Sequence, residues 1–184
     1  MRNDARLAFS TSVTTRGQRE GEIDGEAYHF LSEQEFFERR DNGDLLEWAQ
    51  VFGNYYGTSR LALEESQAEG RDLILDIDVQ GAAQLKDKLP EAITVFILPP
   101  SREELEARLR KRSSDSDAVI ERRLREAAGE ARNYRSYDYV LVNDQVDESF
   151  ERLRGIVLAE RCRKHRVEAE IRPILEGFES EARG

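Results

Sequence analysis

The stretch "LILDIDVQG", residues 73–81, runs an apolar series directly into the carboxylates of Asp76 and Asp78. A continuous apolar run, in place of alternating polar and apolar residues, is typical of a strand buried on both faces in a parallel sheet. In open parallel sheets, ligands bind beyond the carboxyl ends of the strands. The stretch therefore predicts an α/β fold with a ligand site near Asp76.

Three other apolar runs extend this prediction to the rest of the chain: "LAFSTSV" at 7–13, "AITVFIL" at 92–98 and "DYVLVND" at 138–144. Helical patterns separate the last strands. Between 16 and 58 the elements become shorter and glycines more frequent, which indicates a separate lobe inserted into the parallel core.

Helix boundaries are marked by local signals. Ser32 with Glu35, and Ser101 with Glu104, have the spacing of a capping box, and Gly70 closes a helix over 61–69. Residues 146–166 read as one long final helix that turns four apolar residues toward the core: Phe150, Leu153, Val157 and Leu158. After it, apolar residues keep helical spacing up to Phe178, with Pro173 expected to interrupt the helix.

Composition excludes several classes of protein. A net charge of −10 argues against a general nucleic-acid binder, because phosphate backbones require a basic face. No apolar run is long enough to span a membrane, and the opening "MRNDARLAFS" has no apolar region of a signal peptide. The single cysteine, Cys162, fits a reducing, cytoplasmic location.

The segment "STSVTTRGQREGEIDGEAYHF", residues 10–30, begins as a strand and continues into a loop that carries Arg16, Arg19, Glu22 and Tyr28. Two arginines close together after a strand can clamp a phosphate with their planar donor groups, and a tyrosine hydroxyl can add a further donor. The alternative is a solvated loop whose charges pair with each other.

Glu47 stands among apolar residues in "LLEWAQVFGNYYGTS", residues 45–59. A carboxylate here can accept two hydrogen bonds from the N1–H and N2–H₂ edge of guanine. Adenine offers no such pair of donors, so the carboxylate would discriminate between the two bases. A surface glutamate on an edge strand is the alternative.

The basic segment "RLRKRSSDSDAVIERRL", residues 108–124, joins two predicted helices. A serine-containing joint with several arginines indicates a mobile lid that carries cations. Ordinary charged helix surface is the alternative.

Taken together, these segments resemble guanylate kinase over residues 7 to 165. The substrate loop of that family, S-x-S-x-T-T-R-x-x-R-x-G-E-x-x-G-x-x-Y-x-F, is matched at 10–30. Further family blocks are matched by "EWA" (47–49), "GNYYGT" (53–58), "LDIDVQG" (75–81), "FILPPS" (96–101) and "VND" (142–144). The resemblance implies the nucleoside-monophosphate-kinase type of P-loop fold, a parallel sheet with an inserted GMP-binding lobe and a helical lid.

The resemblance also implies site residues. Those for GMP are Ser12, Arg16, Arg19, Glu22, Tyr28, Glu47, Tyr56, Thr58 and Asp76. Those for ATP are Arg108, Arg112, Asn143 and Asp144, with Arg19, Arg112 and Arg123 in catalysis. The implied reaction moves the γ-phosphoryl group of ATP, bound with Mg²⁺, to GMP, and no metal site made of side chains is expected.

The expected divisions of the single domain, 1–184, follow the same resemblance. The GMP-binding lobe covers 13–59, the lid 108–125, the core 60–107 and 126–165, and a C-terminal extension 166–184. The oligomeric state and the role of the extension stay open.

Two positions depart from the family pattern, with Gln18 where a proline is usual and Ser113 where a glycine is usual. The sequence also contains no G-x-x-G-x-G-K-[ST] loop, whose amides and lysine hold the ATP phosphates. We expect that Met1 is internal to a longer protein and that the 184-residue chain is inactive without that loop. The alternative is a non-catalytic guanylate-kinase-like binding module or a GMP sensor.

Overall fold

A computed structural model describes residues 4–112 and 116–181. The chain divides into two compact units, Met1–Thr94 and Val95–Gly184, and each is described by itself. Both contain helices together with parallel strand pairs, which confirms the predicted α/β class.

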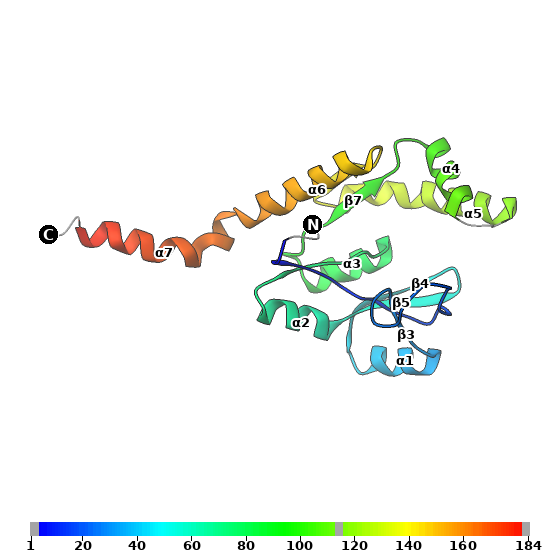
Figure 1. Ribbon diagram of the computed structural model, residues 1–184, viewed down its shortest axis with the longest axis horizontal. Coiled ribbons are helices and arrows are strands. Elements are labelled where there is room, and N and C mark those ends of the chain that lie inside the picture. The colour runs from blue at the N-terminus through cyan, green and yellow to red at the C-terminus, as the bar shows by residue number, and fades with distance from the viewer. Residues whose placement is uncertain (1–3, 113–115, 182–184) are drawn as a thin grey trace. The chain divides into compact units, whose positions relative to one another are not determined.

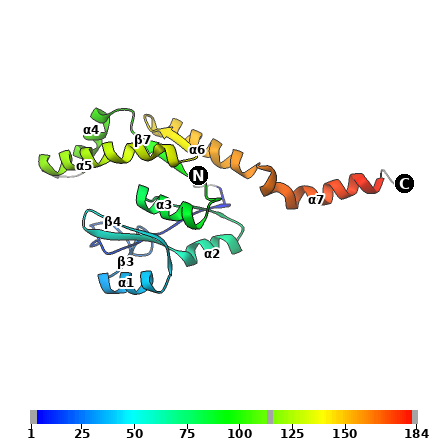
Figure 2. The same cartoon turned by 180° about the vertical axis from the view of Figure 1, so that it is seen from behind.

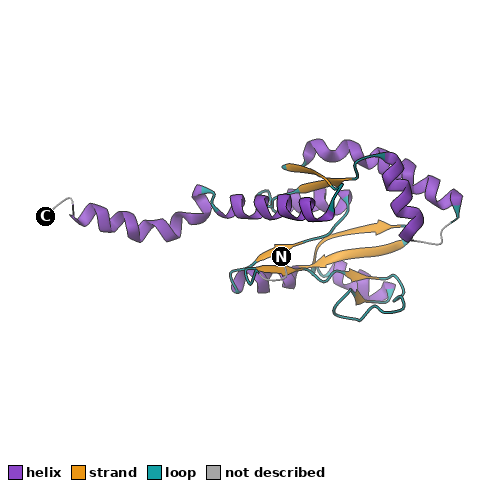
Figure 3. Cartoon of the chain, turned by 45° about the horizontal axis from the view of Figure 1, so that its top comes forward, coloured by secondary structure: helices purple, strands orange, loops and turns teal. Residues whose placement is uncertain are grey.

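The first unit holds a two-stranded parallel sheet and a four-stranded sheet (Figure 1). The two-stranded sheet pairs β1 (Leu7–Phe9) with β6 (Asp72–Ile74). The four-stranded sheet has the order β3-β2-β5-β4, with β2 (Val13–Thr14), β3 (His29–Phe30), β4 (Leu45–Val51) and β5 (Asn54–Ser59). Every strand of this larger sheet lies within the segment 13–59. The antiparallel pair β4 and β5 forms its longest part (Figure 3).

The four-stranded sheet lies between α1 (Glu33–Asp41) and α3 (Val79–Lys88), as Figures 1 and 2 show from opposite sides. A small apolar core of Val13, Phe36 and Leu45 packs α1 against the sheet. Phe36, Phe37 and Tyr55 form a cluster of mutual ring contacts in this layer. Helix α2 (Arg60–Ala68) also belongs to this unit and follows β5 directly.

The second unit pairs β7 (Val95–Leu98) with β8 (Tyr139–Val142) in parallel. Its helices are α4 (Arg102–Arg112), α5 (Asp117–Glu130), the 3₁₀ helix η1 (Ala131–Ser136), α6 (Val146–Arg161) and α7 (Lys164–Glu181). Among the residues described, no helix is both long enough and apolar enough to cross a bilayer. Ser113 and the other residues at 113–115, in the middle of the expected lid, lie outside the described part of the chain.

Several local predictions are confirmed. Ser32 and Glu35 form a complete capping box at the start of α1, and Gly70 follows α2 with a φ of 65°. At α4, the Glu104 N–H donates to Ser101 Oγ at 3.1 Å. These signals act within a few residues, so the sequence alone carries them.

The apolar run at 7–13 is not one strand. β1 pairs with β6, whereas Val13 belongs to β2 and pairs with Gly57 of β5. The run therefore passes from one sheet to the other near Ser10, whose N–H still donates to the Ile74 carbonyl at 2.9 Å. The expected strand around 73–78 also ends early, at Ile74, so Asp76 lies in the loop before α3.

The prediction that the parallel strands are buried on both faces is wrong for β7 and β8. Ile97 is 54% exposed and Val140 47%, while Phe96 and Leu141 are buried. Among the described residues, the two faces of this strand pair thus differ in exposure.

The predicted long helix over 146–166 is also wrong in its end and in part of its buried face. α6 ends at Arg161 and α7 begins at Lys164. Between them, the N–H groups of Cys162 and Arg163 donate to carbonyls three residues earlier, and the regular i→i−4 hydrogen bonds of the α-helix are interrupted. Phe150 and Leu158 are exposed instead of facing a core. Pro173 does not interrupt α7, which continues through it.

Candidate functional site

A pocket with a volume of about 310 Å³ opens in the first unit, within the range of small-ligand sites. The loop after β1, the β4–β5 pair and the loop before α3 contribute its walls. The lining residues are Ser12, Tyr28, Glu47, Ala49, Val51, Tyr56, Gly57, Asp76, Ile77 and Asp78. Five of the nine predicted GMP residues are therefore brought together here: Ser12, Tyr28, Glu47, Tyr56 and Asp76.

Glu47 is the buried charge of this pocket, with 3% of its surface exposed. Its partner is Thr58, which stands opposite it in the antiparallel β4–β5 register. The Thr58 hydroxyl donates to Glu47 Oε1 at 2.6 Å, so Thr58 supports the carboxylate from behind the lining. Burial raises the pKa of the Glu47 carboxyl, and the nearby Asp78 charge adds to this, although the Thr58 hydrogen bond and Lys88 act in the opposite direction.

Helix α3 holds the outer edge of β4, the strand that carries Glu47. The Gln84 side chain donates to the Trp48 carbonyl at 2.6 Å and accepts from the Trp48 N–H at 3.3 Å. Lys88, one turn further along the helix, donates to the Leu46 carbonyl. Because β4 is an edge strand, these side chains supply the hydrogen bonds that a further strand would otherwise make.

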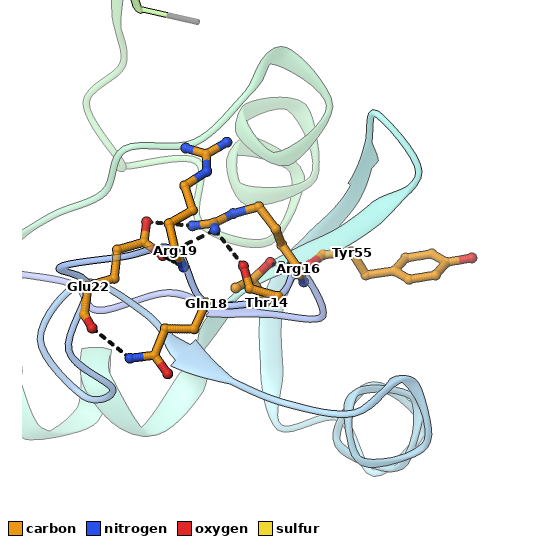
Figure 4. Close-up of polar contacts among 7 residues, drawn as sticks. Thr14, Arg16, Gln18, Arg19, Glu22 and Tyr55 are labelled. Atoms are coloured by element: carbon orange, nitrogen blue, oxygen red, sulfur yellow. Dashed lines mark hydrogen bonds and ion pairs between the residues drawn. The ribbon is translucent and has the colours of Figure 1, made fainter. Parts of the chain in front are cut away.

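Arg16 is held in place by Glu22 (Figure 4). Its two terminal nitrogens meet the two carboxylate oxygens at 2.7 and 3.1 Å, a bidentate pair. The guanidinium also lies over the Tyr28 ring at 5.3 Å and the Phe30 ring at 5.7 Å. The hydrogen bond from Arg16 is the main cause that lowers the pKa of Glu22, and the same bond raises the pKa of Arg16.

Glu22 also organises the rest of this loop. Its carboxylate accepts from the Arg19 N–H at 2.8 Å, and its carbonyl accepts from the Gln18 side chain at 2.6 Å. Figure 4 shows the Arg19 guanidinium directed away from Glu22. Gln18 thus makes a bond that the proline usual at this position could not donate, because proline has no side-chain N–H.

The two pocket tyrosines touch each other edge to face, with ring centroids 6.0 Å apart. Tyr28 thereby links the Arg16 loop to β5, which carries Tyr56. The loop predicted to bind the phosphate is therefore in contact with the pocket wall, although Arg16, Arg19 and Glu22 are not part of the lining.

In the second unit, Arg108 joins α4 to the segment after β8. It donates to the Asn143 carbonyl at 2.9 Å and to the Asp144 carbonyl at 3.3 Å, and it pairs with Glu104 at 2.6 Å. Asn143 Oδ1 is buried without a hydrogen-bond partner among the described residues. Three of the four predicted ATP residues are thus adjacent, while the Arg112 side chain lies outside the described part of the chain. Arg123 is half-buried on α5.

Several residues that line the pocket were given no site role from the sequence, including Asp78, which was noted only as a carboxylate at the end of the apolar run. Asp78 lies beside Asp76 in the quoted stretch, and its carboxylate caps α3 by accepting from the Gly81 N–H at 2.8 Å. Gly57, Ala49 and Val51 carry no chemical signal, and only their strand positions next to Glu47 and Tyr56 would have indicated them. Across residues 4–112 and 116–181, no group of three or more His, Cys, Asp or Glu side chains is placed to hold a metal ion.

Comparison with known proteins gives a consistent result. Residues 1–160 match the family model described as guanylate kinase. The chain is 51% identical to a guanylate kinase of Chelativorans sp. (strain BNC1) over 97% of this chain and 80% of that protein. It is 55% identical to one of Geobacter metallireducens over 88% of this chain and 79% of that protein. The crystal structure of guanylate kinase from Anaplasma phagocytophilum superimposes with a TM-score of 0.76 at 38% identity, covering 88% of this chain and 79% of that one.

Proposed function

The chain belongs to the guanylate kinase family, and from this membership we propose that it acts in purine nucleotide metabolism by transferring the γ-phosphoryl group of ATP to GMP. The products are ADP and GDP. A cytoplasmic place of action is part of the same proposal and agrees with the single cysteine, Cys162.

The observation that supports GMP as the acceptor is the buried carboxylate of Glu47 in the wall of the pocket. Thr58 donates to one carboxylate oxygen, and the remaining acceptor capacity can serve the paired N–H donors of guanine. Adenine would leave the second oxygen of this desolvated carboxylate without a donor from the base, which is costly. Ser12, in the same lining, can add a hydroxyl to the base edge, and Asp76 can help to position the nucleotide.

The arginine loop and the two tyrosines fit the phosphate of GMP. Arg16 is fixed by Glu22, and Arg19 has its guanidinium directed away from that carboxylate. Tyr28 and Tyr56 add hydroxyl groups at the pocket wall. Glu22 would therefore contribute by orienting Arg16 and the loop backbone.

For the donor, the proposed residues are Arg108, Arg112, Arg123, Asn143 and Asp144. The buried Asn143 Oδ1 is an acceptor suited to the amino group of adenine. Mg²⁺ would enter bound to the ATP phosphates, since this ion commonly takes substrate phosphates and few carboxylates as ligands. Phosphoryl transfer depends mainly on alignment and neutralisation of charge, and the lid arginines would supply charge while water is excluded.

Titration with nucleotides tests the proposal. We expect the chain to bind GMP more tightly than AMP in isothermal titration calorimetry. Glu47→Ala should weaken GMP binding by about 1–3 kcal/mol and remove the preference for guanine. Equal binding of GMP and AMP by the unaltered chain would contradict the proposed acceptor.

Turnover is measured separately as ADP formation from ATP with GMP or AMP as acceptor. The assay is run on the chain alone and on the chain preceded by a family phosphate loop segment. GMP-dependent ADP formation supports the kinase. Selective GMP binding without ADP formation in either form would indicate a GMP sensor.

A further inference from the structure

Gly81 lies in the first turn of α3, directly against the carboxylate of Glu47. A Cβ atom on Gly81 would fall inside contact distance of Glu47 Oε2 and 3.0 Å from Glu47 Cδ. The third nearest atom, Asp78 Oδ1, would be at an ordinary 3.4 Å. The space that a side chain would fill at Gly81 is therefore already occupied by Glu47.

The helix itself does not require glycine at this position. Gly81 is not one of the glycines with a positive φ, the conformation that residues with a side chain avoid. A glycine inside a helix is destabilising relative to alanine by roughly 0.5–1 kcal/mol. The benefit of the glycine must therefore come from its neighbour, which is the buried Glu47.

Helix α3 cannot easily move aside to admit a larger residue. Gln84 and Lys88 lie on the same face of α3 as Gly81 and are hydrogen-bonded to the backbone of β4 on both sides of Glu47. The Gly81 N–H is in turn bound by Asp78. The free end of the Glu47 side chain is the part that can shift.

We propose that Gly81 is a specificity-determining residue of the pocket, because its missing side chain leaves the space in which the Glu47 carboxylate is held toward a guanine base. This role depends on the proposed function, in which Glu47 recognises GMP. A methyl group at position 81 would leave the helix intact and displace the carboxylate. It would thus change base selection without touching the ligand.

The test uses the 184-residue chain and four variants: Gly81→Ala, Glu47→Ala, the double variant, and Gly129→Ala as the matched control. Gly129 is also helical, in α5, and a Cβ there would meet nothing within 4 Å. Thermal unfolding and circular dichroism check the fold. Calorimetric titration with GMP and AMP measures affinity and selectivity.

The expected result is a folded Gly81→Ala variant that binds GMP about tenfold more weakly or worse, as for the loss of a hydrogen bond to a charged group. Its preference for GMP over AMP should fall to that of Glu47→Ala, while Gly129→Ala keeps the original values. In the Glu47→Ala background, Gly81→Ala should have no further effect, because the two residues act through one contact.

Three results would overturn the proposal while leaving the proposed function in place. In the first, Gly81→Ala keeps its preference for GMP. In the second, Gly81→Ala lowers GMP affinity as much in the Glu47→Ala background as in the original chain. In the third, Gly81→Ala misfolds and Glu47→Ala does not restore the fold. If Gly81→Ala misfolds and Glu47→Ala restores its melting temperature, the collision is located at Glu47, which supports the proposal. If the unaltered chain shows no preference for GMP over AMP, the proposed function is wrong, and so is the role of Gly81 that depends on it.

Discussion

At the scale of single residues, the chemistry of the pocket is concentrated in Glu47. The carboxylate is almost fully buried and its pKa is raised, so the folded state holds a proton more tightly than the unfolded chain does. The contribution of this group to stability is therefore present at low pH and is lost as the pH rises through the raised pKa. Ligand binding should have the opposite dependence, because guanine offers donors and requires the ionised carboxylate.

Guanosine binding should consequently weaken as the pH falls through the raised pKa of Glu47, above the ordinary value of 4.5. Guanosine is preferred to GMP for this titration because the phosphate has its own pKa of about 6. Calorimetry at a series of pH values, from neutral down to the ordinary carboxyl value of 4.5, measures the effect. Glu47→Gln should bind weakly at every pH, and a Glu47→Gln variant with the original pH dependence would assign the titration to another group.

The arginines can be separated from the base site by the same pair of ligands. Arg19→Ala should weaken GMP binding and leave guanosine binding unchanged, because its guanidinium is proposed to contact only the phosphate. Glu47→Ala should weaken both. Arg39→Ala, an exposed arginine on α1, is the control. An equal loss of guanosine and GMP affinity in Arg19→Ala would show that Arg19 acts on the fold of the loop.

At the scale of elements, the contact between α3 and the edge of β4 holds the strand that carries Glu47. In the described part of the chain, the edge groups of Leu46 and Trp48 are bonded to side chains of one helix, and no strand pairs with this edge. An edge strand without such partners would be open to solvent and to other chains. The helix thus fixes the backbone that carries Glu47.

Gln84→Met tests this contact, since methionine keeps the length of the side chain and removes both hydrogen bonds to Trp48. We expect a loss of about 1–3 kcal/mol in the free energy of unfolding, at about 0.5–1.5 kcal/mol for each bond. Chemical denaturation provides the measurement. Gln67→Met, at an exposed position of α2, is the matched control and should change stability little. A Gln84→Met variant as stable as this control would mean that the two bonds are replaced by water without cost.

At the scale of the whole molecule, the pocket is built from residues 12–78 of the first unit. None of the lining residues belongs to the described part of α7, which exposes Ile174, Leu175 and Phe178. The lining of the pocket therefore comes from the first unit.

Removal of residues 164–184 should leave the affinity for GMP unchanged. Calorimetric titration of the shortened chain against the full 184 residues measures this. The exposed apolar residues of α7 also predict that the shortened chain is no less soluble. A clear loss of GMP affinity would show that α7 supports the pocket indirectly.

The sequence by itself determined those features whose partners are close along the chain. The capping box of Ser32 and Glu35 and the glycine end of α2 depend on backbone hydrogen bonds within one helical turn. The loop motif around Arg16 and the strand with Glu47 were identified because their residue types, in their order, resemble those of a known family. The roles of these residues stay predictions.

The tertiary structure alone decided how exposed each residue is to solvent and which residues far apart in the sequence are in contact. The exposed faces of β7 and β8 and the break between α6 and α7 could not be inferred from apolar spacing, because burial depends on what covers a face. Gly81 meets Glu47 across 34 positions of sequence, and Gln84 meets Trp48 across 36. Such contacts arise only when α3 is folded onto β4, because hydrogen bonding and exclusion of volume act over a few ångströms of space and not along the chain.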